Sequence, residues 1–275
     1  MYLLGSQVRA AGSGFDYHTT PILGCTIAGL PAAPAYMTPA PPAARMIPAL
    51  ITDGGGGASD SITVIYGSAA GIGNGVGFSG AAGAGTTAIP VYSTFGFNLN
   101  DYVLAVDTVG VVPCAIEQIR AAPAAIPGPI TVTALDAAYS ASALLLNLGP
   151  GPTGAADPNA NGPAMTEFAV LNSPAGSASF SLSALDMLGR PPGAGAPTML
   201  VDGVVNIQAQ YGVDTTNDGV IDAWMEPTGL WAATALTSVQ IEQIKAIRVG
   251  MVVRSGLMEK STGGACTTTL AAPVP

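Results

Sequence analysis

Residues 202–224 read DGVVNIQAQYGVDTTNDGVIDAW, and the first half of this stretch alternates between apolar and polar side chains. Alternate residues of an extended strand point to opposite faces. The pattern therefore predicts a β-strand with one face in the core and the other in water. The polar positions are Asn206, Gln208 and Gln210, and the apolar positions are Val205, Ile207, Ala209 and Tyr211.

An acidic turn follows this strand, with Asn217-Asp218-Gly219 at its centre. Asp-Gly favours the positive φ angles of a type I′ turn, so one interpretation is a hairpin that needs no metal. The other is a calcium-binding loop, because such loops take oxygen ligands at alternate positions around a glycine at the sharp turn. The ligands of that loop would be Asp214, Thr216, Asp218, the carbonyl of Val220, Asp222 and Glu226.

Two positions depart from the calcium motif. Thr216 stands where Asp or Asn is usual, and Met225 stands where a bidentate carboxylate is usual. Glu226 would have to supply that carboxylate from one place later. Both interpretations stay open, and an ion held by these hard oxygen ligands would be calcium rather than a transition metal.

The composition points to turns, short strands and loops rather than long helices. Of the 275 residues, 49% are hydrophobic and only 9% are charged, and the 36 Gly and 23 Pro make up about a fifth of the chain. The formal charge is −9 with only eight Lys and Arg, so no basic stripe is available for phosphates. This argues against nucleic acid as a partner.

Three cysteines, Cys25, Cys114 and Cys266, lie far apart and form no C-x-x-C or His/Cys cluster, so zinc is not indicated. In an oxidising compartment Cys114 would pair with either Cys25 or Cys266 and close a long loop. The alternative is three buried cysteines that pack as small hydrophobic residues.

Little in the sequence supports catalysis, so we expect a protein that is not an enzyme. His18 is the only histidine, and its only acidic neighbour along the chain is Asp16. The segment GVGFSG, residues 75–80, matches a dinucleotide-binding pattern, but Gly and Pro follow it where that site needs a helix. A glycine-rich loop is the favoured interpretation.

Alternation predicts further strands, and the fold class expected is α+β, predominantly β, with antiparallel sheets arranged as a meander with long Gly/Pro-rich loops. Residues 19–59 and 147–164 are expected to be irregular, and a capping box of Thr237 with Gln240 predicts a short helix over 237–244. A second short helix is expected over 2–11. The predicted strands lie within 59–68, 100–108, 114–119, 128–135, 165–172, 177–185 and 245–256.

Four of these pieces, LLGSQVRAAGSG, SDSITVIYGS, the 202–224 stretch and IKAIRVGMVVRSG, together resemble the PilW family of type IV pilus assembly proteins, the minor pilins. The most specific part is IQAQYGVDTTNDG, followed after a tryptophan by AIRVGMVVRS. The resemblance implies that residues 1–12 are the remnant of the pilin N-terminal helix and that residues 13–275 form a β-rich globular pilin head. The hydrophobic first half of that helix and its cleavage site are missing, as in a shortened chain or one that borrows a helix from a partner.

The resemblance also implies a function. A minor pilin would take part in pilus assembly, priming and pilus structure through subunit packing, with other minor and major pilins and a tip adhesin as partners. It would reach the cell surface and the pilus (fimbrium) through the inner membrane and periplasm, and would contact the membrane only through a helix absent from this chain. The resemblance favours calcium as a cofactor of the acidic turn. The alternative function is a secreted or surface adhesin, a calcium-stabilised binding module.

Overall fold

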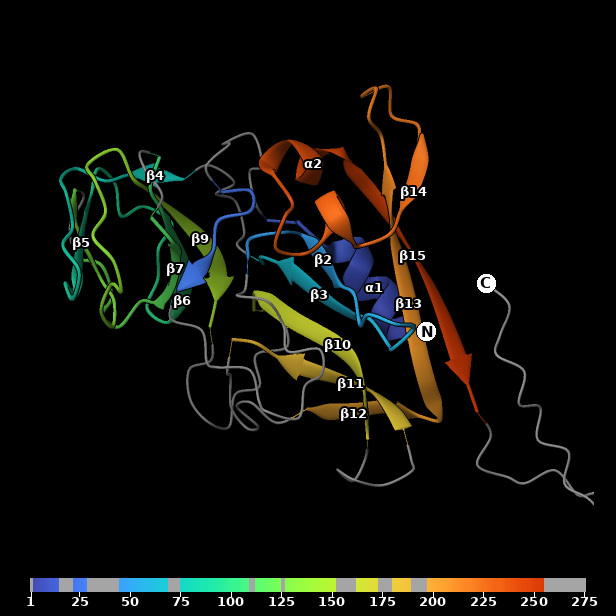
Figure 1. The fold of residues 1–275 in the computed structure, drawn as a ribbon. Helices are drawn as coiled ribbons and strands as arrows, with labels where there is room; N and C mark the ends of the chain where they lie inside the picture. Colours follow the sequence, from blue (N-terminus) through green and yellow to red (C-terminus); the bar gives the residue numbers. More distant parts are fainter. Residues whose placement is uncertain are drawn as a thin grey trace, which may run out of the picture.

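The computed structural model describes residues 2–14, 22–28, 45–68, 75–108, 112–124, 127–151, 162–172, 180–188 and 197–254. This part of the chain is predominantly β, as expected, and its strands pair antiparallel except for one short parallel pair (Figure 1). The helical elements are α1 Tyr2–Ala10, the 3₁₀ turn η1 Gly229–Trp231 and α2 Ser238–Gln243.

The first five-stranded sheet has the order β12-β11-β10-β3-β2. Its central pair is β3 with β10, and Thr63 lies opposite Glu167. The chain between β3 and β10 forms most of the second sheet and the β5-β8 pair, so β3 and β10 are neighbours although they are far apart in sequence. The predicted meander is therefore wrong for the strands 59–68, 100–108, 114–119 and 128–135, of which only β6 and β7 pair as consecutive strands. The strands are β2 Ala49–Thr52, β3 Ser61–Tyr66, β10 Ala164–Asn172, β11 Phe180–Asp186 and β12 Thr198–Asp202.

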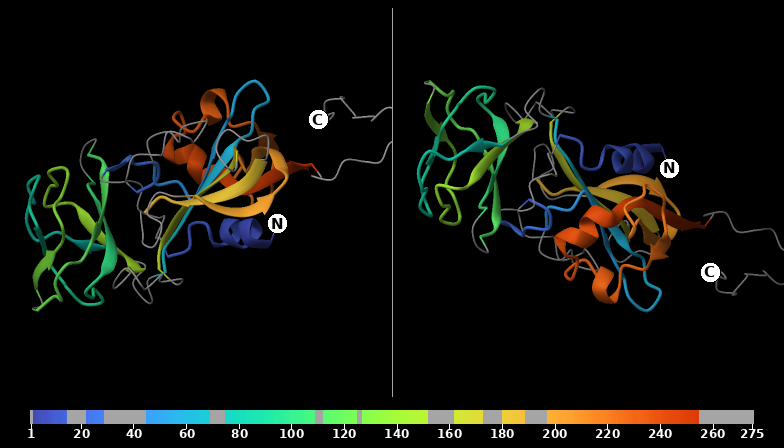
Figure 2. Two further views of the ribbon diagram at one scale, coloured as in Figure 1. Left: turned by 90° about the horizontal axis from the view of Figure 1, so that it is seen from below. Right: turned by 90° about the horizontal axis from the view of Figure 1, so that it is seen from above.

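The second five-stranded sheet, with the order β1-β7-β6-β9-β4, lies at one end of the molecule together with the pair β5-β8 (Figures 1 and 2). The segment 75–80, the dinucleotide-like pattern, contains β4 and a bridge from Phe78 to Val91, so it is part of a sheet rather than the expected glycine-rich loop. Residues 81–100, where a dinucleotide site needs a helix, contain none. The strands are β1 Ile27–Ala28, β4 Val76–Gly77, β5 Ala88–Val91, β6 Asp101–Val106, β7 Cys114–Gln118, β8 Gly128–Thr131 and β9 Leu144–Pro150.

The third sheet has the order β14-β13-β15, with β13 Val204–Val213, β14 Ala223–Met225 and β15 Ile244–Val253. Gly203 joins it to the first sheet, because its N–H donates to the Phe180 carbonyl and its carbonyl accepts from Arg254 N–H. Its φ of +78° is one that a side chain rarely adopts, so glycine suits this corner.

Within the described residues, three clusters of buried apolar side chains fill the spaces between these sheets. The first packs Leu4 of α1 and Ile207 of β13 against Phe168 of the first sheet. The second lies between the two five-stranded sheets, where Met165 and Leu185 share a core with Leu104. The third fills the space between the second sheet and the β5-β8 pair. Both five-stranded sheets are therefore buried on both faces over much of their length.

Burial on two faces explains several differences from the sequence expectations. The alternation of 59–68 is typical of a half-buried strand, yet Ser61 and Thr63 are as buried as their apolar neighbours. The segments 19–59 and 147–164 were expected to be irregular, but they contain β1, β2 and the end of β9. The helix expected over 2–11 and the capping box of Thr237 with Gln240 are confirmed.

One side chain in the 202–224 stretch faces differently from the expectation. The register of β13 on β15 shifts between Val204 and Asn206, which is the mark of a β-bulge. The bulge buries Val204 in the first core and leaves Val205 only half-buried. From Ile207 to Tyr211 the expected alternation is confirmed.

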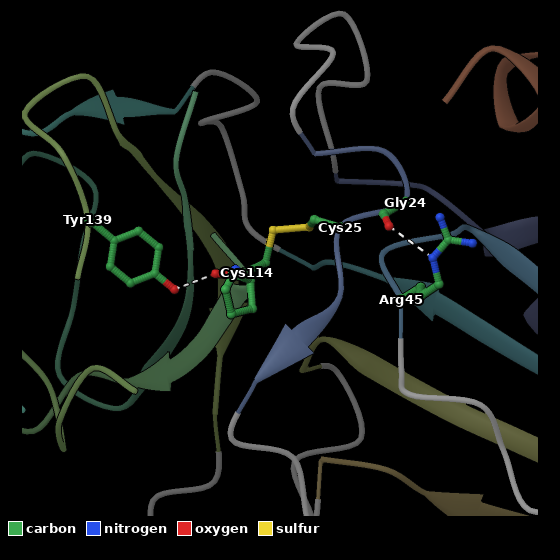
Figure 3. The surroundings of a disulfide bond; sticks show 6 residues. Gly24, Cys25, Arg45, Cys114 and Tyr139 are labelled. Carbon is green, nitrogen blue, oxygen red and sulfur yellow. Dashed lines mark hydrogen bonds between the residues drawn. A yellow bond between two sulfur atoms is a disulfide. The ribbon is translucent and has the colours of Figure 1, made fainter. Parts of the chain in front are cut away.

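The disulfide pairs Cys25 with Cys114, with their Cα atoms 5.9 Å apart, and it selects one of the two pairings left open by the sequence. It ties the segment before β1 to the start of β7 (Figure 3). Next to it, Arg45 donates to the Gly24 carbonyl, while the Tyr139 hydroxyl donates to the Pro113 carbonyl. Cys266 lies outside the described residues.

Candidate functional site

The acidic turn joins β13 to β14 in a hairpin that projects beyond the rest of the sheet (Figure 1). Val213 pairs with Ala223, so the loop itself spans residues 214–222. Asn217 and Gly219 have φ angles of 58° and 86°, whereas Asp218 has no positive φ. The hairpin interpretation is confirmed, but the turn is a nine-residue loop rather than a two-residue type I′ turn.

Asp214 organises the first half of this loop. Its side chain is only 1% exposed, and its oxygens accept hydrogen bonds from the backbone N–H groups of Asp218 at 3.2 Å and Gly219 at 2.8 Å. Burial raises the pKa of Asp214, but these backbone donors outweigh it and hold the pKa below its usual value. The carboxylate therefore acts as an internal cap for the loop.

Asp222 organises the second half of the loop. Its Oδ2 accepts from the hydroxyl of Thr215 at 2.7 Å, from the backbone N–H of Thr215 at 2.8 Å and from that of Thr216 at 3.1 Å. The Thr215 hydroxyl and these N–H groups hold the pKa of Asp222 below its usual value. Both carboxylates are thus satisfied by the loop that they close.

The predicted calcium ligands do not all converge. Thr216 Oγ1 lies 3.4 Å from Asp214 Oδ1, but the Asp218 carboxylate accepts from the backbone N–H of Val220, two residues later, and Glu226 accepts from Gln210 on the sheet. Within the described ranges, no group of three His, Cys, Asp or Glu side chains could hold a metal ion. The hairpin accounts for the loop without a metal, and calcium binding stays a prediction.

Calcium binding predicts that millimolar calcium raises the Tm, since an ion that binds only the folded state stabilises it by mass action. Asp218→Ala should remove the rise, because Asp218 is the central ligand of the motif. Asp53→Ala, another exposed acid next to glycines, should leave the rise intact and serves as the control. A Tm that millimolar calcium does not change would contradict calcium binding.

The hairpin also carries a patch of exposed apolar side chains, which we call the hairpin patch: Val220, Ile221 and Trp224. Trp224 lies over Gly212, since a Cβ at Gly212 would be 3.0 Å from the indole and 3.1 Å from Ile221 Cδ1. Glycine in a strand next to an aromatic ring is a sequence signal for such close packing. The Arg248 guanidinium lies 4.7 Å from the centroid of the Trp224 ring, within the range of a cation–π contact.

The outer face of the third sheet is polar beside this patch. Gln210 accepts from Arg248 and donates to Glu226, and Gln208 donates to the carbonyl of Ala58 at 2.7 Å. The wet face expected for this strand is thereby confirmed. The bond to Gln210 holds Arg248 in place, and Trp224 packs between Arg248 and Gly212, so the hairpin patch is presented to solvent on an ordered support.

Exposed aromatic residues also occur at the other end of the molecule. Tyr92 and Phe95 lie in the loop after β5, and Phe95 is 74% exposed. Asp101 and Asn147, both buried, hold this loop by hydrogen bonds. The Asn147 amide donates to the carbonyl of Gly96 and to the Asp101 carboxylate. The same carboxylate accepts from the backbone N–H of Asn98.

Two features bear on catalysis and charge. His18, the candidate for histidine chemistry, lies outside the described residues.

Glu167 of β10 was not singled out by the sequence, although it is fully buried and neither of its carboxyl oxygens has a hydrogen-bond partner. In the sequence Glu167 is a single charged residue within the strand pattern MTEFAVLN, residues 165–172. That pattern does not reveal that the face of the strand carrying Glu167 is buried.

Comparison with known proteins gives a match to one family over part of the chain. Residues 167–273 match the family model described as Type IV Pilus-assembly protein W, PilW. The matched range begins in β10 and contains β11 to β15, the acidic loop and the hairpin patch. No curated protein and no solved structure matches the chain. Among the described residues, no helix is both long and apolar enough to span a bilayer.

Proposed function

We propose that this PilW-like protein is a minor pilin that takes part in type IV pilus assembly and priming, and in pilus structure, through subunit packing. The match over residues 167–273 supports involvement in type IV pilus assembly and carries the proposal. PilW is a pilus-assembly family rather than a class of enzymes, which agrees with the expectation of a non-enzymatic protein.

The position of α1 supports the proposed division of the chain. Leu4 is buried in the core formed by the first and third sheets, and Val8 and Ala11 pack against the same core. The end of α1 is tied to β3, because Gly12 N–H donates to the Ile65 carbonyl at 2.8 Å. A helix on a β-rich head is the arrangement proposed here, with residues 1–12 as the remnant of the pilin helix and 13–275 as the head.

The hairpin patch supports packing as the mode of action. Val220 is 63% exposed and Trp224 is 39% exposed, and both lie within the matched range. Aromatic residues held on an ordered support are enriched at the centres of protein interfaces. We propose that other pilins, minor and major, or a tip adhesin cover this patch.

The proposed location is the pilus at the cell surface, reached through the inner membrane and periplasm. The Cys25–Cys114 disulfide supports it, because disulfides persist mainly in extracytoplasmic compartments.

The test uses the native strain with its own copy of the gene deleted and variants supplied in its place. We expect deletion to remove most surface filaments and the unchanged protein to restore them. Trp224→Ala combined with Val220→Ser should fail to restore filaments while the purified protein still folds, with a Tm lowered only by the loss of the packing of Trp224 on Gly212 and Arg248. The readouts are filament counts by electron microscopy and mass spectrometry of sheared filaments.

Phe95→Ala is the matched control, because it removes an exposed aromatic side chain outside the matched range. It should restore filaments fully under a packing role for the hairpin patch. Normal filaments after deletion would contradict the minor-pilin proposal. Saccharide binding by the purified protein that Phe95→Ala abolishes would instead favour the adhesin alternative, for which the exposed Tyr92 and Phe95 are the supporting observation.

A further inference from the structure

Glu167 occupies the middle of the first sheet. It pairs with Thr63 of β3 on one side and with Leu185 of β11 on the other. Paired residues of antiparallel strands point to the same face, and so do residues two apart on one strand. Glu167 therefore shares a face with Met165, which belongs to the core between the two five-stranded sheets.

Around Glu167 this face is polar. We call the group the polar cluster, and all its members are buried: Ser61, Thr63, Glu167, Ser181 and Ser183. The hydroxyls of Ser181 and Ser183 lie 3.3 Å apart, whereas Ser61 Oγ and both carboxyl oxygens of Glu167 make no hydrogen bond of good geometry. The Ser61 hydroxyl is close enough to favour the charged carboxylate only in part. A buried carboxylate with so little donation is costly, so the neutral form is favoured here.

The strands around Glu167 bring no charge to this face. From β3 it is flanked by Ser61, Thr63 and Ile65, and from β11 by Ser183 and Leu185. Asp186 of β11 alternates to the opposite face, and Tyr211 of β13 packs in the core on that opposite side. The second sheet contributes apolar side chains such as Leu104 and Leu146 to the shared core, and its one titratable side chain among the described members of that core is the partly buried Tyr102 of β6.

We propose that Glu167 is a pH-operated latch: the first sheet packs tightly on the second while this buried carboxyl is protonated, and loss of the proton puts an uncompensated charge between the two sheets and loosens β10 from β3 and β11. Glu167 is the first residue of the PilW match, whereas Ser61 and Thr63 of the polar cluster precede it, and none of the cluster belongs to the hairpin patch. The latch does not depend on the proposed pilus function.

The direction of the pH effect follows from linkage. Burial raises the pKa of Glu167 to about 7, and the nearby Ser61 hydroxyl offsets part of this. In the unfolded chain the pKa of a Glu is about 4.3. The folded state therefore holds the proton more tightly, so the latch stabilises fully below the unfolded pKa, and this contribution is lost as the pH rises through the folded pKa.

The first measurement is carboxyl NMR of the folded protein labelled at its five glutamates, with Glu167→Gln used to assign the signal. We expect the Glu167 carboxyl to titrate near pH 7. The second is hydrogen exchange between pH 5 and 8, with each amide's free energy of opening corrected for its intrinsic rate. β3, β10 and β11 should lose protection as the pH rises, and Glu167→Gln should remove most of that loss.

Glu117 of β7 is the matched control, because burial first, and the charge of Asp136 second, raise its pKa to about 7 as well. In Glu117→Gln the first sheet should still lose protection with rising pH. A Glu167 carboxyl that titrates at the ordinary pH of a glutamate would overturn the proposal. So would protection of β10 that does not change with pH; the wild-type titration decides the matter even if Glu167→Gln does not fold.

Discussion

Replacing Cys114 by serine is expected to lower the free energy of unfolding by about 4 kcal/mol. The Cys25–Cys114 bridge spans 89 residues of sequence, and closing a long loop removes much of the conformational freedom of the unfolded chain. In the folded state the bridge also holds β1, a strand of only two residues, at the edge of the second sheet. Without it, that parallel pairing has few contacts of its own.

Urea unfolding of the oxidised protein and of Cys114→Ser measures this effect. Cys25→Ser should lower the stability by a similar amount, because either change removes the same bridge, and Cys266→Ser should leave the bridge intact. Reduction of the unchanged protein should reproduce the loss seen in both variants. Equal urea midpoints for the oxidised and reduced protein would show that the bridge contributes nothing to stability.

The elements that the sequence predicts well are those whose signals are local. The alternation from Ile207 to Tyr211 specifies β13, and Thr237 with Gln240 specifies the start of α2, because each pattern is complete within a few residues. The acidic hairpin belongs to the same class, since Asp214 and Asp222 close the loop within nine residues.

Features set by distant parts of the chain could not be predicted. Nothing in the sequence selects Cys25 over Cys266 as the partner of Cys114, because the choice depends on β1 lying beside β7. Val204 rather than Val205 is buried in the core because of a β-bulge, and only the pairing of β13 with β15 reveals that bulge. Glu167 lies in a strand pattern that fits a solvent face equally well, and its burial follows from the packing of two sheets.

Replacing Arg45 by alanine is expected to lower the free energy of unfolding by about 3 kcal/mol, because three carbonyl acceptors lose a charged donor at once. Its guanidinium donates to the carbonyls of Gly24 at 3.0 Å, Ala233 at 2.9 Å and Leu236 at 2.7 Å. Arg45 therefore joins the segment beside the disulfide to the chain around α2, nearly 190 residues later.

The planar guanidinium can donate to all three carbonyls at once because its N–H groups point in different directions, whereas a Lys ammonium cannot reach all three. Arg45→Lys should therefore recover only part of the stability lost in Arg45→Ala. Arg120→Ala is the control: its guanidinium also bonds Thr133 Oγ1 and Gln118, but these bonds are exposed, and its loss should cost less than about 0.5 kcal/mol. In hydrogen exchange, Arg45→Ala should expose the amides of Gly24 and Leu236, whose segments it holds together. A stability equal to that of Arg120→Ala would mean that water replaces the guanidinium at no cost. The segment around α2 would then be held on the first core by its apolar contacts, those of Ala233, Leu236 and Ile241 among them.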